Sequence, residues 1–182
     1  MKWLILLLLL SLLIVALLLW RVWRPTQHLN VGDQAPAFAL PDQHGQQHTL
    51  EQYRGRWLVV YFYPRDDTPG CTKEACQFRD AFAPLKALHA EVIGISVDDA
   101  NSHARFAAKY QLTFPLLADV HGEVAKQYGA LVKLGRFKMA RRISFIISPH
   151  SRIAYVFSKV DTARHAGDVM RILKNLQNGA KM

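Results

Sequence analysis

The feature that most constrains this chain is an apolar run that ends in a broken loop and a cysteine. Residues 57–63 are apolar without interruption, as expected of a strand that is buried on both faces of a sheet. Pro64, Pro69 and Gly70 interrupt the stretch that follows, and Cys71 stands where a helix should begin. The first N–H groups of a helix lack an internal partner and favour an anion. The thiol of Cys71 should therefore ionise more easily than a free thiol, and the thiolate is the nucleophile.

The rest of the chain alternates between strand-like and helix-like segments. The predicted strands are a small hairpin of residues 38–40 and 47–50, followed by residues 57–63, 91–97, 114–117, 143–147 and 153–157. The predicted helices begin at residue 70 or 71, after Asp98 and Asp99, at residue 122 and near residue 163, and Pro84 should break the first of them. This alternation predicts an α/β layered domain, and 182 residues suffice for one such domain.

Around the cysteine, the pattern Pro64-x-x-x-Thr68-x-x-Cys71 resembles the active-site motif of the peroxiredoxins. Its continuation to Cys76 is similar to the subgroup known as bacterioferritin comigratory protein or peroxiredoxin Q. Further segments follow in that family's order, namely residues 31–38, 93–96, 114–119 and 142–145. The resemblance covers roughly residues 31–177. It implies a thioredoxin-like fold of the peroxiredoxin type and a thiol-dependent peroxidase that reduces hydrogen peroxide and organic hydroperoxides.

Cleavage of a peroxide by a thiolate requires donors that polarise the O–O bond and a dry pocket that fixes the line of attack. The hydroxyl of Thr68 can donate to the peroxide, and the backbone N–H groups of Gly70 and Cys71 are further candidate donors. The ring of Pro64, which has no N–H, would shield the sulfur and its oxidised product. These four residues are the candidate catalytic and substrate-binding groups of the loop.

A cation is also needed beside the thiolate, and the resemblance places Arg142 there. Arg142 is accordingly predicted to act both in catalysis and in substrate binding. In a strand the adjacent Arg141 would point to the opposite face, so only one of the two can enter the site. Glu74 could interact with Arg142 or with Lys73, or it could be a solvated helix carboxylate.

The sulfenic acid formed on Cys71 condenses with a second thiol, and Cys76, the only other cysteine, is the expected resolving residue. On a helix, five residues correspond to a rise of about 7.5 Å and a rotation of about 140°. A disulfide rarely joins Cα atoms more than about 7 Å apart, so residues 71–77 are predicted to unwind in each cycle. The resemblance implies that thioredoxin or a similar dithiol protein then reduces the disulfide.

Two other functions stay open at this point. A thiol–disulfide oxidoreductase normally carries Cys-x-x-Cys, whereas four residues separate the cysteines here. A non-enzymatic peroxide sensor would instead signal to a partner through its oxidised, unwound helix. The eight histidines show no ligand spacing, so no metal and no other cofactor is predicted.

The net charge of +9 favours acidic surfaces, but the chain has no recognisable nucleic-acid-binding motif. Residues 133–142 are predicted to form an exposed basic loop, for which contact with lipid headgroups is left open. The folded domain is expected to be monomeric.

The first residues differ in kind from the rest. Residues 3–20 contain no charged residue and one polar residue, Ser11. As a helix they would be about 27 Å long, close to the hydrocarbon thickness of a bilayer. Residues 1–24 are therefore predicted to be an N-terminal transmembrane anchor, residues 25–30 a linker and residues 31–178 the peroxiredoxin domain. A cleaved signal peptide is the alternative, although no small-x-small cleavage site follows the apolar run.

An uncleaved anchor would make the chain a single-pass protein of a bacterial inner membrane, bound to the bilayer through residues 3–20. Lys2 precedes the apolar run and Arg21 and Arg24 follow it, so the positive-inside rule barely distinguishes the two orientations. The short head before the run favours a periplasmic domain, and a cytoplasmic domain stays open. A periplasmic domain would need a membrane-fed thiol relay in place of thioredoxin.

Overall fold

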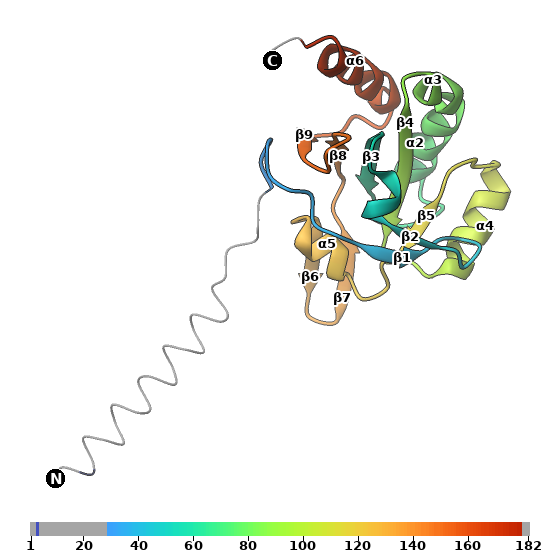
Figure 1. Cartoon of the computed structure of the whole chain (residues 1–182). Coiled ribbons are helices and arrows are strands. Elements are labelled where there is room, and N and C mark those ends of the chain that lie inside the picture. Colours follow the sequence, from blue (N-terminus) through green and yellow to red (C-terminus); the bar gives the residue numbers. More distant parts are fainter. Residues whose placement is uncertain (1–2, 4–28, 180–182) are drawn as a thin grey trace.

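A mixed sheet lies at the centre of the structure, a computed structural model that describes residue 3 and residues 29–179 (Figure 1). Its strands are β3 (Trp57–Phe62), β4 (Ala90–Ser96), β5 (Leu116–Ala118), β8 (Ile143–Ile147) and β9 (Ile153–Phe157). They lie side by side in the order β5–β4–β3–β8–β9. β3, β4 and β5 are mutually parallel, whereas β8 is antiparallel to both β3 and β9. Parallel strands joined by helices and a terminal antiparallel pair agree with the predicted α/β layers.

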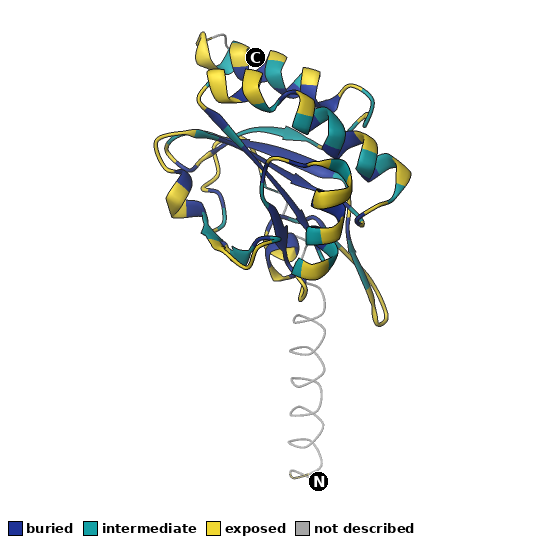
Figure 2. Ribbon diagram, turned by 90° about the vertical axis from the view of Figure 1, so that its right-hand side faces the viewer, coloured by how far each residue is buried: buried dark blue, intermediate teal, exposed yellow. Residues whose placement is uncertain are grey.

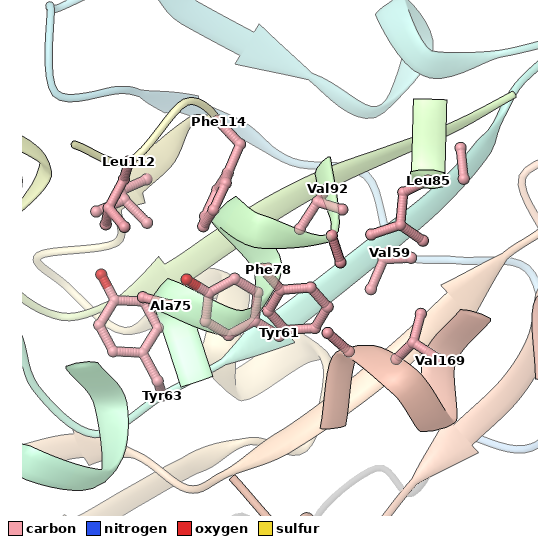
Figure 3. Close-up of a cluster of buried hydrophobic side chains, with 14 of the residues drawn as sticks. Val59, Tyr61, Tyr63, Ala75, Phe78, Leu85, Val92, Leu112, Phe114 and Val169 are labelled. Carbon is pink, nitrogen blue, oxygen red and sulfur yellow. The ribbon is translucent and has the colours of Figure 1, made fainter. Parts of the chain in front are cut away.

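The central strand β3 faces two separate apolar cores, because successive side chains of a strand point to opposite faces. Val59 and Tyr61 belong to the first core, and Leu58 and Phe62 belong to the second. All four are fully buried, and Figure 2 shows the dark sheet enclosed between layers whose outer surfaces are exposed. In the first core the ring of Tyr61 stacks on Phe78, with centroids 4.9 Å apart (Figure 3). Burial on both faces explains why this strand carries no polar alternation.

Among residues 29–179, four helices contribute buried side chains to the first core. They are α2 (Pro69–Asp80), α3 (Phe82–Ala87), α4 (Ala100–Tyr110) and α6 (His165–Gln177). Pro84 lies in the first turn of α3, so the helical stretch breaks at Ala81, as predicted. The carboxylate of Asp99 accepts a hydrogen bond of 2.8 Å from the backbone N–H of Ser102, which confirms the predicted cap of α4.

Shorter elements close the second core. They are the hairpin of β1 (Ala39–Pro41) and β2 (Gln47–Thr49), the 3-10 helix η1 (Leu50–Tyr53) and the helix α5 (Glu123–Gln127). Leu50 and Tyr53 from η1 and Val124 from α5 are buried in this core. The second face of the sheet is thus covered without a long helix.

One predicted loop is a hairpin instead. Residues 133–142, expected to form an exposed basic loop, contribute to the antiparallel pair β6 (Leu131–Leu134) and β7 (Phe137–Ala140). Gly135 makes the turn with a φ of 59°, a conformation that glycine adopts without steric strain. The prediction was wrong because the strands have few core-facing side chains, so the usual contrast between buried and exposed positions is absent from the sequence.

The predicted anchor and most of the linker lie outside the described residues, apart from Trp3. No helix among residues 29–179 combines the length and apolar character that crossing a bilayer requires. The continuous description begins at Leu29, whose side chain packs against the second core.

Candidate active site

The candidate nucleophile lies in the first turn of α2. β3 ends at Phe62, and the loop that follows leads to Thr68, the N-cap residue of α2, with Pro69 at the first helical position. The backbone N–H of Thr72 donates to the carbonyl of Thr68 at 2.8 Å, which is the bond that begins the helix. Cys71 therefore lies among N–H groups that precede the first intrahelical bond, where a negative charge is favoured. Its side chain is only 1% exposed and belongs to the first core.

A guanidinium group lies directly beside the sulfur. Nη2 of Arg142 is 3.2 Å from Sγ of Cys71, although 71 residues separate them in sequence. The sheet register causes this approach, because Phe62 at the end of β3 pairs with Ile143 at the start of β8. The residue before β8 is thereby placed beside the loop that follows β3.

Gly70 leaves room for the guanidinium of Arg142, whereas the adjacent Arg141 lies outside the site. A Cβ atom on Gly70 would lie 3.3 Å from Nη2 of Arg142, a tight contact, so a glycine here leaves room for the guanidinium. Arg141 is exposed, and its backbone N–H donates to the carbonyl of Ala130 at 2.7 Å. Both arginines precede β8 rather than lie in it, yet only Arg142 faces the sulfur.

The sequence left the state of Glu74 open, and the structure shows it buried. Its carboxylate is fully shielded from solvent and forms an ion pair with Nη1 of Arg142. Arg142 therefore bridges Cys71 and Glu74 through two different nitrogens. Burial raises the pKa of Glu74 to about 7, even though Arg142 opposes the shift. Burial also acts to lower the pKa of Arg142, but Glu74 and the hydrogen bond to Cys71 outweigh it, so this pKa lies above its usual value.

A buried histidine that the sequence did not single out completes this cluster. Nε2 of His165, at the start of α6, lies 2.9 Å from Oγ of Ser144 and 3.8 Å from Oε1 of Glu74. Oε1 has no hydrogen-bond partner among the described residues. Burial lowers the pKa of His165 to about 4, so this ring is neutral at physiological pH and gives Glu74 no compensating charge.

These opposite shifts predict compensating effects on stability. Glu74 binds its proton more tightly in the folded state, so its contribution to the free energy of unfolding falls as pH rises from about 4.5 to about 7. His165 binds its proton less tightly in the folded state, so its contribution rises between about pH 4 and about pH 6.5. In Glu74→Gln the falling contribution is absent. The free energy of unfolding should then increase over this range by up to about 3 kcal/mol, whereas that of the unaltered protein stays nearly flat.

Urea denaturation of both proteins at intervals from about pH 4.5 to pH 7.5 measures this difference. Parallel profiles would contradict the assignment of the raised pKa to Glu74. The double variant Glu74→Gln/His165→Gln should lose the rising contribution as well, which separates the two groups.

The other predicted site residues lie in the loop before Cys71 or in the first turn of α2. The hydroxyl of Thr68 donates to the carbonyl of Arg65 at 3.1 Å, and its lone pairs stay free to accept. Pro64 is half-buried directly after Tyr63, and Gly70 is half-buried in the first turn of α2. Thr68 is half-buried as well, whereas the side chain of Cys71 itself is almost fully buried.

A second buried network anchors the loop between β3 and α2, and no spacing pattern in the sequence indicated it. The carboxylate of Asp66 lies 2.8 Å from Nδ1 of His103 on α4 and accepts a hydrogen bond of 2.8 Å from the hydroxyl of Tyr63. Next to it, Asp67 pairs with Lys109 of α4 at 2.7 Å. These contacts attach the loop to α4 and thereby hold the start of α2 in place.

Cys76 lies on the same helix as Cys71, five residues later, and is half-buried. Both thiols are free. Because α2 is continuous from Pro69 to Asp80, the sulfurs are separated by more than a helical turn along the axis. Within residues 29–179 there is no cluster of three or more histidine, cysteine or acidic side chains that could hold a metal ion.

Comparison with known proteins relates this geometry to a family. Residues 31–156 match the model of the AhpC/TSA family. The chain is 41% identical over 146 residues to a putative peroxiredoxin, bcp, of Coxiella burnetii, which covers 78% of this chain and 97% of the relative.

Solved structures give the same result. The crystal structure of the peroxidoxin BcpB of Mycobacterium tuberculosis is similar with a TM-score of 0.78 and 35% identity, over 82% of this chain and 99% of that one. The bacterioferritin comigratory protein of Xanthomonas campestris is similar with a TM-score of 0.72 and 32% identity, over 79% of this chain and 92% of that one. These similarities confirm the thioredoxin-like fold of the peroxiredoxins. The chain belongs to the AhpC/TSA family, in its bacterioferritin comigratory protein and peroxiredoxin Q group, and is a thiol-dependent peroxidase.

Proposed function

We propose that Cys71 is the peroxidatic nucleophile and that Arg142, Thr68 and the backbone N–H groups of Gly70 and Cys71 bind the peroxide. The observation that carries this assignment is the 3.2 Å contact between Nη2 of Arg142 and Sγ of Cys71 at the start of α2. A permanent cation and the first N–H groups of the helix can stabilise negative charge at this position while the sulfur reacts. Pro64 forms a wall of the site that offers no competing donor.

In the first step the thiolate attacks one peroxide oxygen, the S–O bond forms and the O–O bond breaks. The other oxygen leaves with the electron pair and takes up a proton, as water from hydrogen peroxide or as an alcohol from an organic hydroperoxide. The sulfur is oxidised to the sulfenic acid while the peroxide is reduced. The structure of the Xanthomonas campestris protein is described in terms of alkyl peroxide reduction, which supports organic hydroperoxides as substrates here as well.

In the second step Cys76 attacks the sulfenic acid, water leaves and a Cys71–Cys76 disulfide forms. This requires residues 71–77 to unwind, because a disulfide cannot bridge the separation that the intact helix imposes. Unwinding also exposes Glu74, whose burial disfavours its ionised form at neutral pH. The release of this carboxylate to water lowers the free energy of the unwound state relative to the helix.

Thioredoxin or a thioredoxin-like dithiol protein then reduces the disulfide by thiol–disulfide exchange. We further propose that residues 1–24 anchor the chain in a bacterial inner membrane, with the domain on the periplasmic side. The uncharged apolar run of residues 3–20 supports this location. A periplasmic domain would receive electrons from a membrane-fed dithiol rather than from cytoplasmic thioredoxin.

Stopped-flow consumption of hydrogen peroxide, with thioredoxin as the recycling reductant, tests the mechanism against its alternatives. Sustained turnover in the full-length chain that vanishes in Cys71→Ser is the expected result. Insulin reduction without peroxide turnover would indicate a thiol–disulfide oxidoreductase, and a single oxidation without recycling would indicate a sensor. A carboxyl-terminal fusion reporter that is active on one side of the membrane tests the location.

A further inference from the structure

The hairpin of β6 and β7 carries an apolar face that is largely exposed. Partners across an antiparallel pair share a face, and successive pairs alternate. The pairs Val132↔Met139 and Leu134↔Phe137 therefore lie on one face of the hairpin. Leu134 is 80% exposed, Phe137 55% and Val132 44%. These four residues form the apolar hairpin face.

The opposite face of the hairpin combines core contacts with charge. The pair Leu131↔Ala140 at its base packs toward the second core, with Ala140 fully buried. The next pair along the hairpin is Lys133↔Lys138, two cations directly opposite each other. Like charges in this position destabilise a strand pair unless an anion lies near them.

Further cations surround the same hairpin. Arg136 is exposed in the turn, and Arg141 is exposed directly after β7. Among residues 29–179, neither arginine nor either of the two lysines forms an ion pair with a carboxylate, whereas other exposed arginines pair with one three residues away. The ammonium of Lys138 instead reaches the carbonyls of Val120 and His121 at 3.3 Å, which ties β7 to the domain. The hairpin and its flank thus carry positive charge without carboxylate partners, in addition to the apolar hairpin face.

We propose that this hairpin is a docking surface for an anionic phospholipid bilayer. Apolar side chains next to lysine and arginine are the combination that enters the headgroup–acyl boundary while the cations contact phosphates. The net charge of +9 acts in the same direction. Figure 1 shows the hairpin projecting from the domain, at the end opposite α6, so its tip can meet a flat surface before the rest of the domain does.

The chain outside the described part is compatible with this position. Residues 21–28 connect the apolar run of residues 3–20 to Leu29 and reach at most about 28 Å when extended. A bilayer that holds the apolar run would therefore lie within about 28 Å of Leu29. The hairpin would make a second contact that sets the orientation of the domain, and hence of Cys71, relative to the membrane.

Spin labels on the full-length chain test the proposal. With both native cysteines replaced (Cys71→Ser and Cys76→Ser), single labels are attached through Leu134→Cys or Phe137→Cys, and a control label through Lys174→Cys on the exposed side of α6. The chain is reconstituted into vesicles of phosphatidylethanolamine and phosphatidylglycerol. Collision rates with oxygen and with a water-soluble nickel chelate are then measured for each label. Labels at 134 and 137 are expected to lose nickel collisions and gain oxygen collisions, whereas the label at 174 stays accessible to nickel.

Charge is tested in the same system. Vesicles of phosphatidylcholine alone, or the added substitutions Lys133→Glu and Arg136→Glu, are expected to restore nickel collisions at 134 and 137. If these labels stay in contact with lipid under both conditions, the role of anionic headgroups is wrong. If they are accessible to nickel in every vesicle, or show spin–spin broadening from a second copy, the docking surface is not a lipid site. Peroxide turnover by Leu134→Ser/Phe137→Ser with both native cysteines present should equal that of the unaltered chain in detergent, which shows that the hairpin variants fold.

Discussion

Cys76→Ser should consume the first equivalent of peroxide at the normal rate and then fail to recycle. The first step needs only Cys71, Arg142 and the helix start, none of which the substitution alters. The second step has no thiol with which to form the intramolecular disulfide, so turnover recycled by thioredoxin should fall to background. The sulfenic acid that accumulates on Cys71 should then pass to the sulfinic and sulfonic acids as peroxide is added. Stopped-flow kinetics of the first turnover and intact-mass spectrometry of the product measure both effects.

The matched control is Cys71→Ser, which should lose the first turnover as well as the recycled one. Normal recycling of Cys76→Ser with thioredoxin would show that another route resolves the sulfenic acid. A Cys71–Cys76 disulfide in the unaltered protein, formed while α2 keeps full amide protection, would instead contradict the unwinding of residues 71–77.

Arg142→Ala should reduce the second-order rate constant for peroxide by about 10²–10³-fold, the effect of removing one well-placed donor from a site where charge is redistributed. Nη2 of Arg142 is the cationic donor at 3.2 Å from the sulfur, and it carries charge at every pH of interest. The substitution also leaves Glu74 buried without its partner, and where this group is ionised the unpaired buried charge destabilises the fold by about 3–5 kcal/mol. Activity and stability would therefore fall together in this variant.

Two further variants separate these effects. Arg142→Ala/Glu74→Gln removes the unpaired carboxylate, so it should recover stability while the rate constant stays low. Arg141→Ala removes the exposed neighbour and should change the rate by no more than about twofold, as for an ordinary surface position. Equal losses from Arg141→Ala and Arg142→Ala, measured by competition for peroxide with a reference peroxidase, would show that the two arginines act through the surface charge rather than through the contact with Cys71.

The burial of Glu74 links stability to the catalytic cycle. α2 is held in the folded state by buried Phe78 and Ala75 and by the ion pair of Glu74 with Arg142. At neutral pH that ion pair is offset by the desolvation that raises the pKa of Glu74 to about 7. The region that must unwind is therefore less stable than its apolar packing alone would make it, which suits a helix that opens once per turnover.

Local patterns in the sequence predicted the elements that depend on neighbouring residues. The uninterrupted apolar run of residues 57–63 marked a strand buried on both faces, and the prolines and Gly70 marked the turn before Cys71. The cap by Asp99 and the break near Pro84 follow from backbone chemistry over a few residues, and both are present. The hairpin of β6 and β7 was missed, because its apolar side chains face outward and so give no core-facing periodicity.

Charged residues were harder to assign, since their state depends on what packs against them. The sequence alone determined that a cysteine stands at a helix start in a peroxiredoxin-like loop, because that follows from residue types at short spacing. Only the tertiary structure decided that Glu74 is buried, that His165 lies 3.8 Å from it and that Arg142 bridges it to the sulfur. The physical reason is that pairing of β3 with β8 brings together groups about seventy residues apart, and the desolvation and partners of a charge arise from such contacts, which no local pattern encodes.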